Sequence, residues 1–190
     1  MTEESTPASG RRRADAVRNT QAVLLAAKAA FAEAGVDAPM RDIAARAGVG
    51  VGTIYRNYPL RSDLIIAVFR NEVDETAAEA ERLAAEHPPA DALRRWAVRF
   101  GRFVAAKRGF ASALHSGDPA YRPLPAYFLG RLGPKVQSIL DAGALDGSIR
   151  EDVRAEDLIH ALSRLADDDS GDRRSLMTDV LLDGLLVTEH

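Results

Sequence analysis

The chain has 190 residues, of which 46% are hydrophobic, so it can bury one or two helical cores. It contains no cysteine, which excludes disulfides, thiolate chemistry and zinc sites with cysteine ligands. No apolar run approaches the roughly 20 residues of a membrane-spanning helix, and the start of the chain does not resemble a signal peptide. We therefore expect a cytoplasmic protein with no membrane contact.

The charges are distributed unevenly, although the net charge is only −3. Residues 10–70 carry ten Lys or Arg against five Asp or Glu, a local charge of +5. Residues 71–190 carry fifteen against twenty-one, a local charge of −6. Because a basic region is typical of a segment that contacts nucleic acid, the charge pattern places any DNA-binding surface in the first third of the chain.

The first residues are small, polar and without periodicity, and Arg11, Arg12 and Arg13 follow them directly. This composition predicts a disordered basic arm over residues 1–14. The arginine triplet has two interpretations. It is either a solvated run of charge or an arm that tracks phosphates or enters a minor groove.

The apolar spacing predicts an all-α chain of about nine helices, because no segment alternates every second residue as a strand would. The first helices are expected at about 15–34, 40–47, 51–57 and 61–86. A strongly amphipathic helix follows at 91–107. Prolines then interrupt the pattern up to Pro134 and predict kinks or loops. The last helices are expected at about 136–145, 155–166 and 173–187.

The segment from Met40 to Leu64 has the pattern of a helix-turn-helix motif. Two short helices that cross steeply need a small residue at their contact and a residue that tolerates positive φ at the turn. Ala44 and Gly48 meet these two needs. The apolar contacts on both sides are expected from Ile43, Ala47, Val49, Ile54 and Tyr58. A plain antiparallel helix pair with a glycine turn is the alternative interpretation.

The outward face of the second short helix presents groups that are suited to DNA. Thr53, Tyr55 and Asn57 can hydrogen-bond phosphate oxygens. Arg56 can reach a phosphate or make a bidentate contact to guanine. These four side chains are the expected centre of the DNA-binding surface.

Two further contributions to DNA binding are expected from neighbouring positions. Gly50 and Gly52 leave the N-terminus of the second short helix bare, so its backbone N–H groups can approach a phosphate closely. Arg41, near the start of the preceding helix, is expected to be a second residue that reads bases.

These residues resemble the tetracycline-repressor (TetR) family of bacterial regulators over about residues 15–70. The matching motifs are Ile43-Ala44, Ala47-Gly48-Val49, Gly52-Thr53-Ile54-Tyr55 and Tyr58-Pro59 with Arg61 and Leu64. The resemblance implies phosphate contacts for Thr53, Tyr55 and Arg61. Two positions depart from the family pattern. Pro39-Met40 stands before the first short helix, where family members commonly have Ser or Thr. Gly50 stands where many members cap the second short helix with Ser, and glycine is the weaker cap by roughly a few tenths of a kcal/mol.

We expect a helix-turn-helix domain over residues 15–60 and a ligand-binding and dimerisation domain over residues 61–190. The resemblance implies a homodimer formed by the last two helices, and two apolar stripes allow a four-helix bundle between two copies. The stripes are Leu158, Ile159, Leu162 and Leu165 with Leu176, Val180, Leu181, Gly184 and Val187. The alternative is that they only close the core of one chain. Two DNA-binding heads spaced by about 34 Å, one turn of DNA, or by a small multiple of it, would read a palindrome.

Aromatic residues of the second domain are the candidate lining of a small-molecule pocket. The expected lining residues are Trp96, Phe100, Phe103, Phe110, Leu114, Tyr121, Tyr127 and Phe128, with His115, Arg131 and His160 as polar anchors. An aromatic stripe of this kind also occurs in closed cores, which is the alternative interpretation. The two histidines are expected to be exposed or hydrogen-bonded rather than metal ligands, and we expect no cofactor.

The expected function is that of a ligand-responsive repressor, released from double-stranded operator DNA by a small-molecule effector. The repressor role is implied by the family resemblance alone. A ligand-independent activator or an architectural DNA-binding protein is the alternative. An enzyme is the remote alternative, because the chain has no Gly-x-Ser-x-Gly, phosphate-loop or His-Glu-x-x-His motif.

Overall fold

The computed structural model describes the backbone of residues 7–167 and 171–187, and the side chains of residues 15–107, 109–165 and 176–187. These residues form nine α-helices and two short 3-10 helices without a strand, which confirms the expected all-α fold. No helix among them is both long enough and apolar enough to cross a membrane. The chain divides into two compact units, residues 1–68 with 109–121 and residues 69–108 with 122–190.

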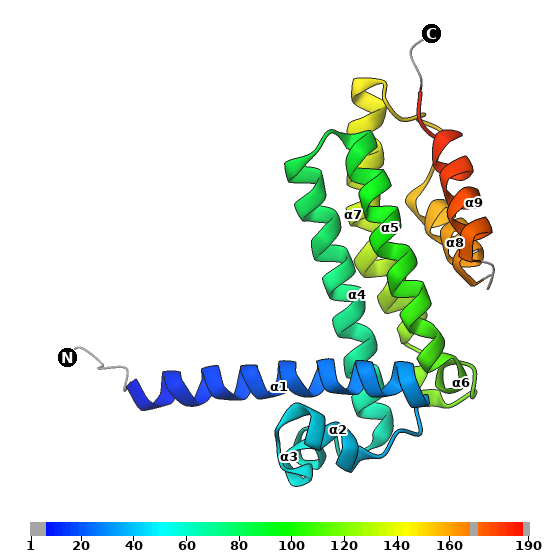
Figure 1. Cartoon of the computed structure of the whole chain (residues 1–190). Coiled ribbons are helices and arrows are strands. Elements are labelled where there is room, and N and C mark those ends of the chain that lie inside the picture. The colour runs from blue at the N-terminus through cyan, green and yellow to red at the C-terminus, as the bar shows by residue number, and fades with distance from the viewer. Residues whose placement is uncertain (1–6, 168–170, 188–190) are drawn as a thin grey trace. The chain divides into compact units, whose positions relative to one another are not determined.

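The first unit holds helices α1 (Pro7–Ala34), α2 (Met40–Ala47), α3 (Val51–Asn57) and the start of α4 (Arg61–Glu86) (Figure 1). The chain returns to this unit with α6 (Ala111–Leu114), η2 (Pro119–Tyr121) and most of η1 (Arg108–Phe110). Buried apolar side chains from all these segments except η2 form one core. Because α2 and α3 are too short to be stable alone, this core holds them in place.

Helix α1 begins at Pro7, well before the expected start near Asp15. The expectation of a disordered arm over residues 1–14 is therefore wrong for residues 7–14, while residues 1–6 lie outside the described part of the chain. Proline is well tolerated at the first position of a helix. The Arg and Ala residues that follow have high helix propensity, so local preference extends the helix beyond the part that the core requires.

The second unit holds the rest of α4, α5 (Pro89–Lys107), α7 (Leu124–Asp146), α8 (Ala155–Asp167) and α9 (Gly171–Asp183). Helix α5 packs against α7 and α8, and α8 also packs against α7 and α9. An isolated antiparallel bridge joins Ile149 to Leu186, and an ion pair between Arg94 and Asp183 ties α5 to the end of α9. The buried apolar faces of these helices make the core of this unit.

Helix α7 runs through two of the prolines that were expected to cause kinks or loops, so it begins at Leu124 and not near residue 136, and the loop alternative is wrong there. Pro125 lies in the first turn, where a backbone N–H has no partner within the helix. Pro134 lies inside the helix but on its exposed side. Leu132 and Val136 are fully buried on the other side, and their burial offsets the hydrogen bond that Pro134 cannot make.

The boundary between the compact units differs from the expected domain boundary at residue 60. It falls inside α4, between Val68 and Phe69, and residues 109–121 belong to the first unit. The last helix also ends at Asp183 rather than near Val187, because Leu186 leaves the helix to pair with Ile149. Because the unit boundary falls after Val68, the start of α4 belongs to the first unit and contributes to its core.

Candidate DNA-binding site

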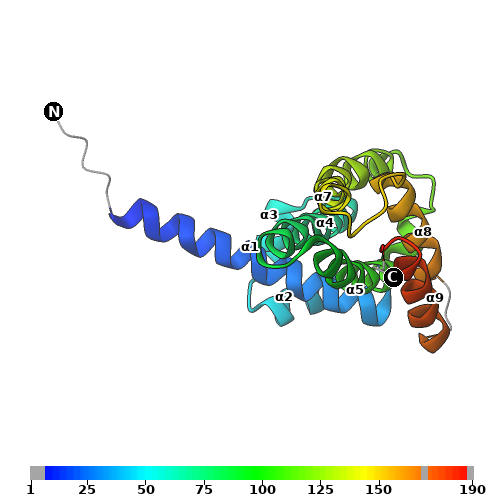
Figure 2. The ribbon, with the colours of Figure 1, turned by 90° about the horizontal axis from the view of Figure 1, so that it is seen from above.

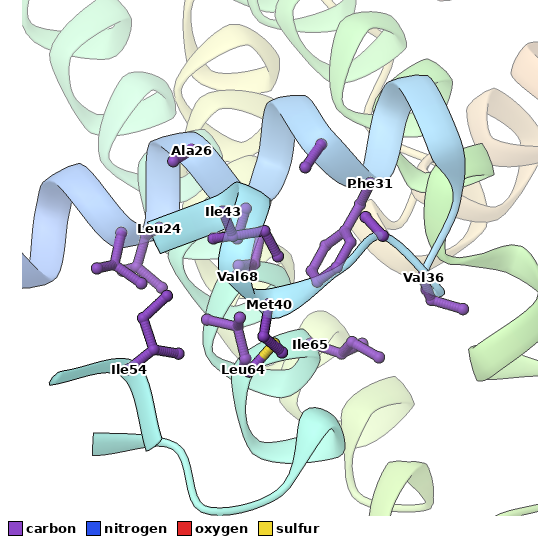
Figure 3. Packing of buried hydrophobic residues seen from close by; sticks show 14 of the residues in the cluster. Leu24, Ala26, Phe31, Val36, Met40, Ile43, Ile54, Leu64, Ile65 and Val68 are labelled. Carbon is purple, nitrogen blue, oxygen red and sulfur yellow. The ribbon is translucent and has the colours of Figure 1, made fainter. Parts of the chain in front are cut away.

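Buried apolar side chains hold α2 and α3 against each other and against α1. Ile43 and Ile54 have no exposed surface, and Ala44 is nearly as well buried. The Ile54 side chain extends from α3 toward Leu24 of α1 (Figure 3). Three further residues pack at the edge of this cluster: Ala47, Val49 and Tyr58. The apolar residues predicted to set the helix-turn-helix angle are thus confirmed.

The turn between α2 and α3 depends on Gly48. Its φ of 67° lies in the left-handed region, where glycine avoids the strain that a Cβ would cause. Two backbone hydrogen bonds close the turn, from Gly48 N to Ala45 O at 3.2 Å and from Val49 N to Ala44 O at 3.0 Å. Glycine at this position therefore directs the chain sharply into α3, as the sequence predicted.

Neither short helix has a side-chain cap at its N-terminus. Pro39 precedes α2 and Gly50 precedes α3, and neither provides a side-chain hydrogen bond to its helix. The Thr53 N–H donates to Gly50 O at 2.8 Å, and no side chain caps the N–H groups ahead of it. Gly52 is exposed, and a Cβ built on it would meet nothing within 4 Å.

Four of the residues expected to contact DNA lie on α3: Thr53, Tyr55, Arg56 and Asn57. Tyr55 is 50% exposed, and Arg56 and Asn57 are also exposed. Thr53 is half-buried, and its hydroxyl accepts a hydrogen bond from Arg56 Nη2 at 3.1 Å. The Asn57 side-chain amide donates to Thr53 O at 3.1 Å. These two bonds link Arg56 and Asn57 to Thr53, one helical turn earlier.

Arg41 has an 84% exposed side chain on α2, and its Nε lies 3.3 Å from the Asp42 carboxylate. An exposed ion pair of this length constrains a side chain only weakly. Arg41 is therefore available to a ligand, as its expected role requires.

Arg61 has a structural role that the sequence did not predict. Its side chain is half-buried, and Nη1 donates to the carbonyl oxygens of Val36 at 2.5 Å and Ala38 at 2.7 Å. These two carbonyls belong to the loop between α1 and α2, so Arg61 fastens that loop to the start of α4. Since one guanidinium presents five N–H donors, this anchoring is compatible with the expected phosphate contact.

A second link that sequence reasoning missed joins α1 to α2. Arg46 Nη1 and Nη2 lie 2.9 and 2.6 Å from the two oxygens of Glu33, a bidentate geometry. The hydrogen bonds from Arg46 lower the pKa of the Glu33 carboxyl. The positive charge of Arg46 is therefore matched within the protein, which separates it from the arginines of the candidate DNA surface.

The residues expected to line one pocket fall into two groups. Trp96, Phe100 and Phe103 are buried in the second unit, where Phe128 stacks on Phe103 with ring centroids 5.7 Å apart. Phe110 is instead buried in the core of the first unit, and two more expected lining residues pack against that core: Leu114 and Tyr121. These three residues therefore belong to the first unit, whereas the main aromatic group belongs to the second unit.

The expected polar anchors also differ in their surroundings. Arg131 Nε donates to Asp74 at 2.6 Å, and the Tyr127 hydroxyl donates to the other Asp74 oxygen at 2.7 Å. Burial and this hydrogen bond to Asp74 raise the pKa of Tyr127. His115 and His160 are both exposed. The network of Asp74 on α4 with Tyr127 and Arg131 on α7 thus lies in the second unit, which also holds the aromatic group of Trp96, Phe100, Phe103 and Phe128.

The two C-terminal helices use their apolar residues differently. On α8, Leu158, Ile159 and Leu162 are buried, so this stripe closes the core of its own unit. On α9, Leu176 is 58% and Val180 54% exposed. The residues that α9 and the following segment bury are instead Leu182 and Leu185, which were not in the expected stripe. An apolar face of α9 is left without a partner among the described residues of the chain.

Two family models match the chain. Residues 23–68 match the model of bacterial regulatory proteins of the tetR family, and residues 88–187 match the SbtR-like transcriptional regulator C-terminal domain. The second match alone covers more than half of the chain. The protein therefore belongs to the TetR family of transcriptional regulators, as its helix-turn-helix residues indicate.

Transcriptional regulators that are similar in sequence agree with this assignment. An HTH-type transcriptional repressor of Mycobacterium tuberculosis is 34% identical over 139 residues, which are 72% of this chain and 65% of the relative. The chain thus spans just under two thirds of that curated relative. The solved structure of the TetR regulator SCO0520 from Streptomyces coelicolor is 38% identical, with a TM-score of 0.76 over 90% of this chain and 99% of that one. A TetR regulator from Mycobacterium vanbaalenii is 36% identical, with a TM-score of 0.73 over 92% and 99%.

Proposed function

We propose that the protein is a homodimeric repressor that binds a palindromic operator and is released from it by a small-molecule effector. The observation that carries this proposal is the exposed polar face of α3, supported from behind by the fully buried Ile54. A rigid helix that presents Thr53, Tyr55 and Arg56 outward can enter a major groove. The family of the chain supports the same role.

Selection of DNA from a random pool by the purified full chain tests the proposal. We expect a palindromic duplex to be enriched, because two identical heads read two half-sites. Tyr55→Ala should then weaken binding to all duplexes, since phosphate contacts carry no sequence information. Arg56→Ala should relax the preference at one base pair per half-site by about 1–3 kcal/mol.

The control for Arg56→Ala is Arg102→Ala, which removes an equally charged exposed side chain from the second unit. This variant should bind the selected duplex like the wild type. If no duplex is enriched, or if Tyr55→Ala and Arg56→Ala bind like the control, α3 is not the reading element.

The exposed apolar face of α9 supports the homodimer. Leu176, Met177 and Val180 are spaced so that they share one side of a helix, and all three are at least 40% exposed. Monomeric proteins rarely expose a contiguous apolar face, and a two-fold partner would cover it with the same face of a second copy.

Sedimentation of two matched variants tests the dimer. Val180→Asp places a charge on the proposed interface, so we expect a shift toward the monomer. Val98→Asp is the control, since Val98 is exposed to a similar extent, 59% against 54%, on α5. Equal dimerisation of both variants would exclude this face as the interface.

The aromatic group of the second unit supports the effector response. Phe100 lies between Trp96 and Phe103, with ring centroids 5.0 and 5.9 Å away, and the Asp74 network adds polar groups in the same unit. An effector should raise the melting temperature of the protein and release the selected duplex. A ligand-independent activator or architectural protein would bind the duplex, and no small molecule that is tested would release it.

A further inference from the structure

Helix α1 continues far beyond the part that packs into the core of the first unit. Among the side chains that are described, Val23 is the first buried one, and residues 15–22 are exposed or half-buried. The helix nevertheless begins at Pro7. At 1.5 Å per residue, residues 7–22 add about 24 Å of helix ahead of the core.

The N-terminal part of α1 extends from the core of the first unit beside α3. Ile54 of α3 extends toward Leu24, which lies one residue after the first buried position of α1 (Figure 3). In both views of the ribbon, the N-terminal half of α1 projects past α2 and α3 (Figures 1 and 2). The projecting segment thus starts where the candidate reading helix is anchored.

The composition of this segment is strongly basic. Residues 7–22 contain four arginines and one aspartate, a net charge of +3. Three of the arginines are consecutive, Arg11, Arg12 and Arg13, and the fourth, Arg18, pairs with Asp15 in an exposed contact. Val17 is 69% exposed on the same stretch. Isolated helices of this length are only marginally stable in water, so an anionic partner would stabilise the segment.

We propose that residues 7–22 form a helical arm whose arginines bind the phosphates that flank each half-site of the operator. The length of the arm equals the rise of about seven base pairs of DNA. The arm lies outside residues 23–68, which the family model matches, so it adds DNA contacts beyond those of the helix-turn-helix. This inference rests on the proposed function, since it assumes that α3 reads DNA. The arm supplies affinity and footprint length, while α3 supplies sequence preference.

The test compares two full-length triple variants on the duplex that the wild type selects. Arg11→Gln, Arg12→Gln and Arg13→Gln remove three charges from the arm, and glutamine has a helix propensity close to that of arginine. The control removes three charges from exposed positions of the second unit, with Arg102→Gln, Arg122→Gln and Arg154→Gln. Both variants keep the buried residues of α1, so unfolding temperatures near that of the wild type are expected.

The measured quantities are the slope of log affinity against log salt and the hydroxyl-radical footprint. Affinity falls with salt, so the slope is negative, and each lost phosphate contact reduces its magnitude by about 0.9, or about 2.7 per head for all three. We expect this drop and the loss of the outermost protections for the arm variant only. An unchanged slope and footprint, or an equal drop in the control, overturns the proposal. If the pool yields no selected duplex, the proposed function itself fails.

Discussion

Replacement of Gly109 by alanine is expected to destabilise the first unit. A Cβ at this position would lie 2.5 Å from the carbonyl oxygen of Phe31, 2.9 Å from the Phe31 carbonyl carbon and 3.2 Å from the Cα of Ala32. All three neighbours are backbone atoms of α1, so no rotation of a side chain can relieve the contact. The clash therefore requires α1 or the 109–121 segment to move.

Two interactions oppose that movement. The Phe31 carbonyl accepts a hydrogen bond from Gly35 N at 2.9 Å, which closes the end of α1. The Phe31 ring is fully buried and meets the Phe110 ring edge to face, with centroids 5.5 Å apart. Overpacking of a well-packed core costs about 1–3 kcal/mol, and a clash with fixed backbone belongs at the upper end, about 2–3 kcal/mol.

Thermal and urea unfolding of matched variants measures this effect. Gly101→Ala is the control, because Gly101 lies inside α5 and a Cβ there meets nothing within 4 Å. Alanine in the middle of a helix is better than glycine by roughly 0.5–1 kcal/mol, so the control should be slightly more stable than the wild type. If Gly109→Ala is as stable as Gly101→Ala, the close approach between residue 109 and α1 does not exist.

Two further substitutions probe the helix-turn-helix domain. Gly48→Ala should lower the free energy of unfolding by about 1–2 kcal/mol in urea unfolding, because φ is 67° at this position. Gly52→Ala is its control and should not lower this free energy, because Gly52 lies at a regular position of α3. Glu33→Gln should reduce stability at neutral pH by breaking the link to Arg46. Since the pKa of Glu33 is lowered in the folded state, its contribution is present above the unfolded pKa and is lost as the pH falls through the folded pKa. The wild type and Glu33→Gln should therefore converge in acid, and a difference that persists there would show that the charge is not responsible.

The sequence alone determined the helix-turn-helix, because each of its parts depends on neighbours close in the chain. The positive φ of the turn requires a residue such as Gly48, and the helical periodicity of Ile43, Ala44 and Ile54 places them on inner faces. Pro59 stops α3 in the same local way. Local chemistry was therefore enough to predict the exposed face of Tyr55 and Arg56.

Only the tertiary structure decided which contacts distant residues make. The half-burial of Arg61 depends on the Val36 and Ala38 carbonyls, which lie more than 20 positions earlier in the chain. The continuation of α7 through Pro134 depends on the burial of its opposite face, which no local rule on proline contains. On α9 the helical period showed that one side is apolar, but the neighbours that bury Leu182 and leave Val180 exposed come from the fold. Periodicity reports which residues share a face, whereas only packing decides what that face meets.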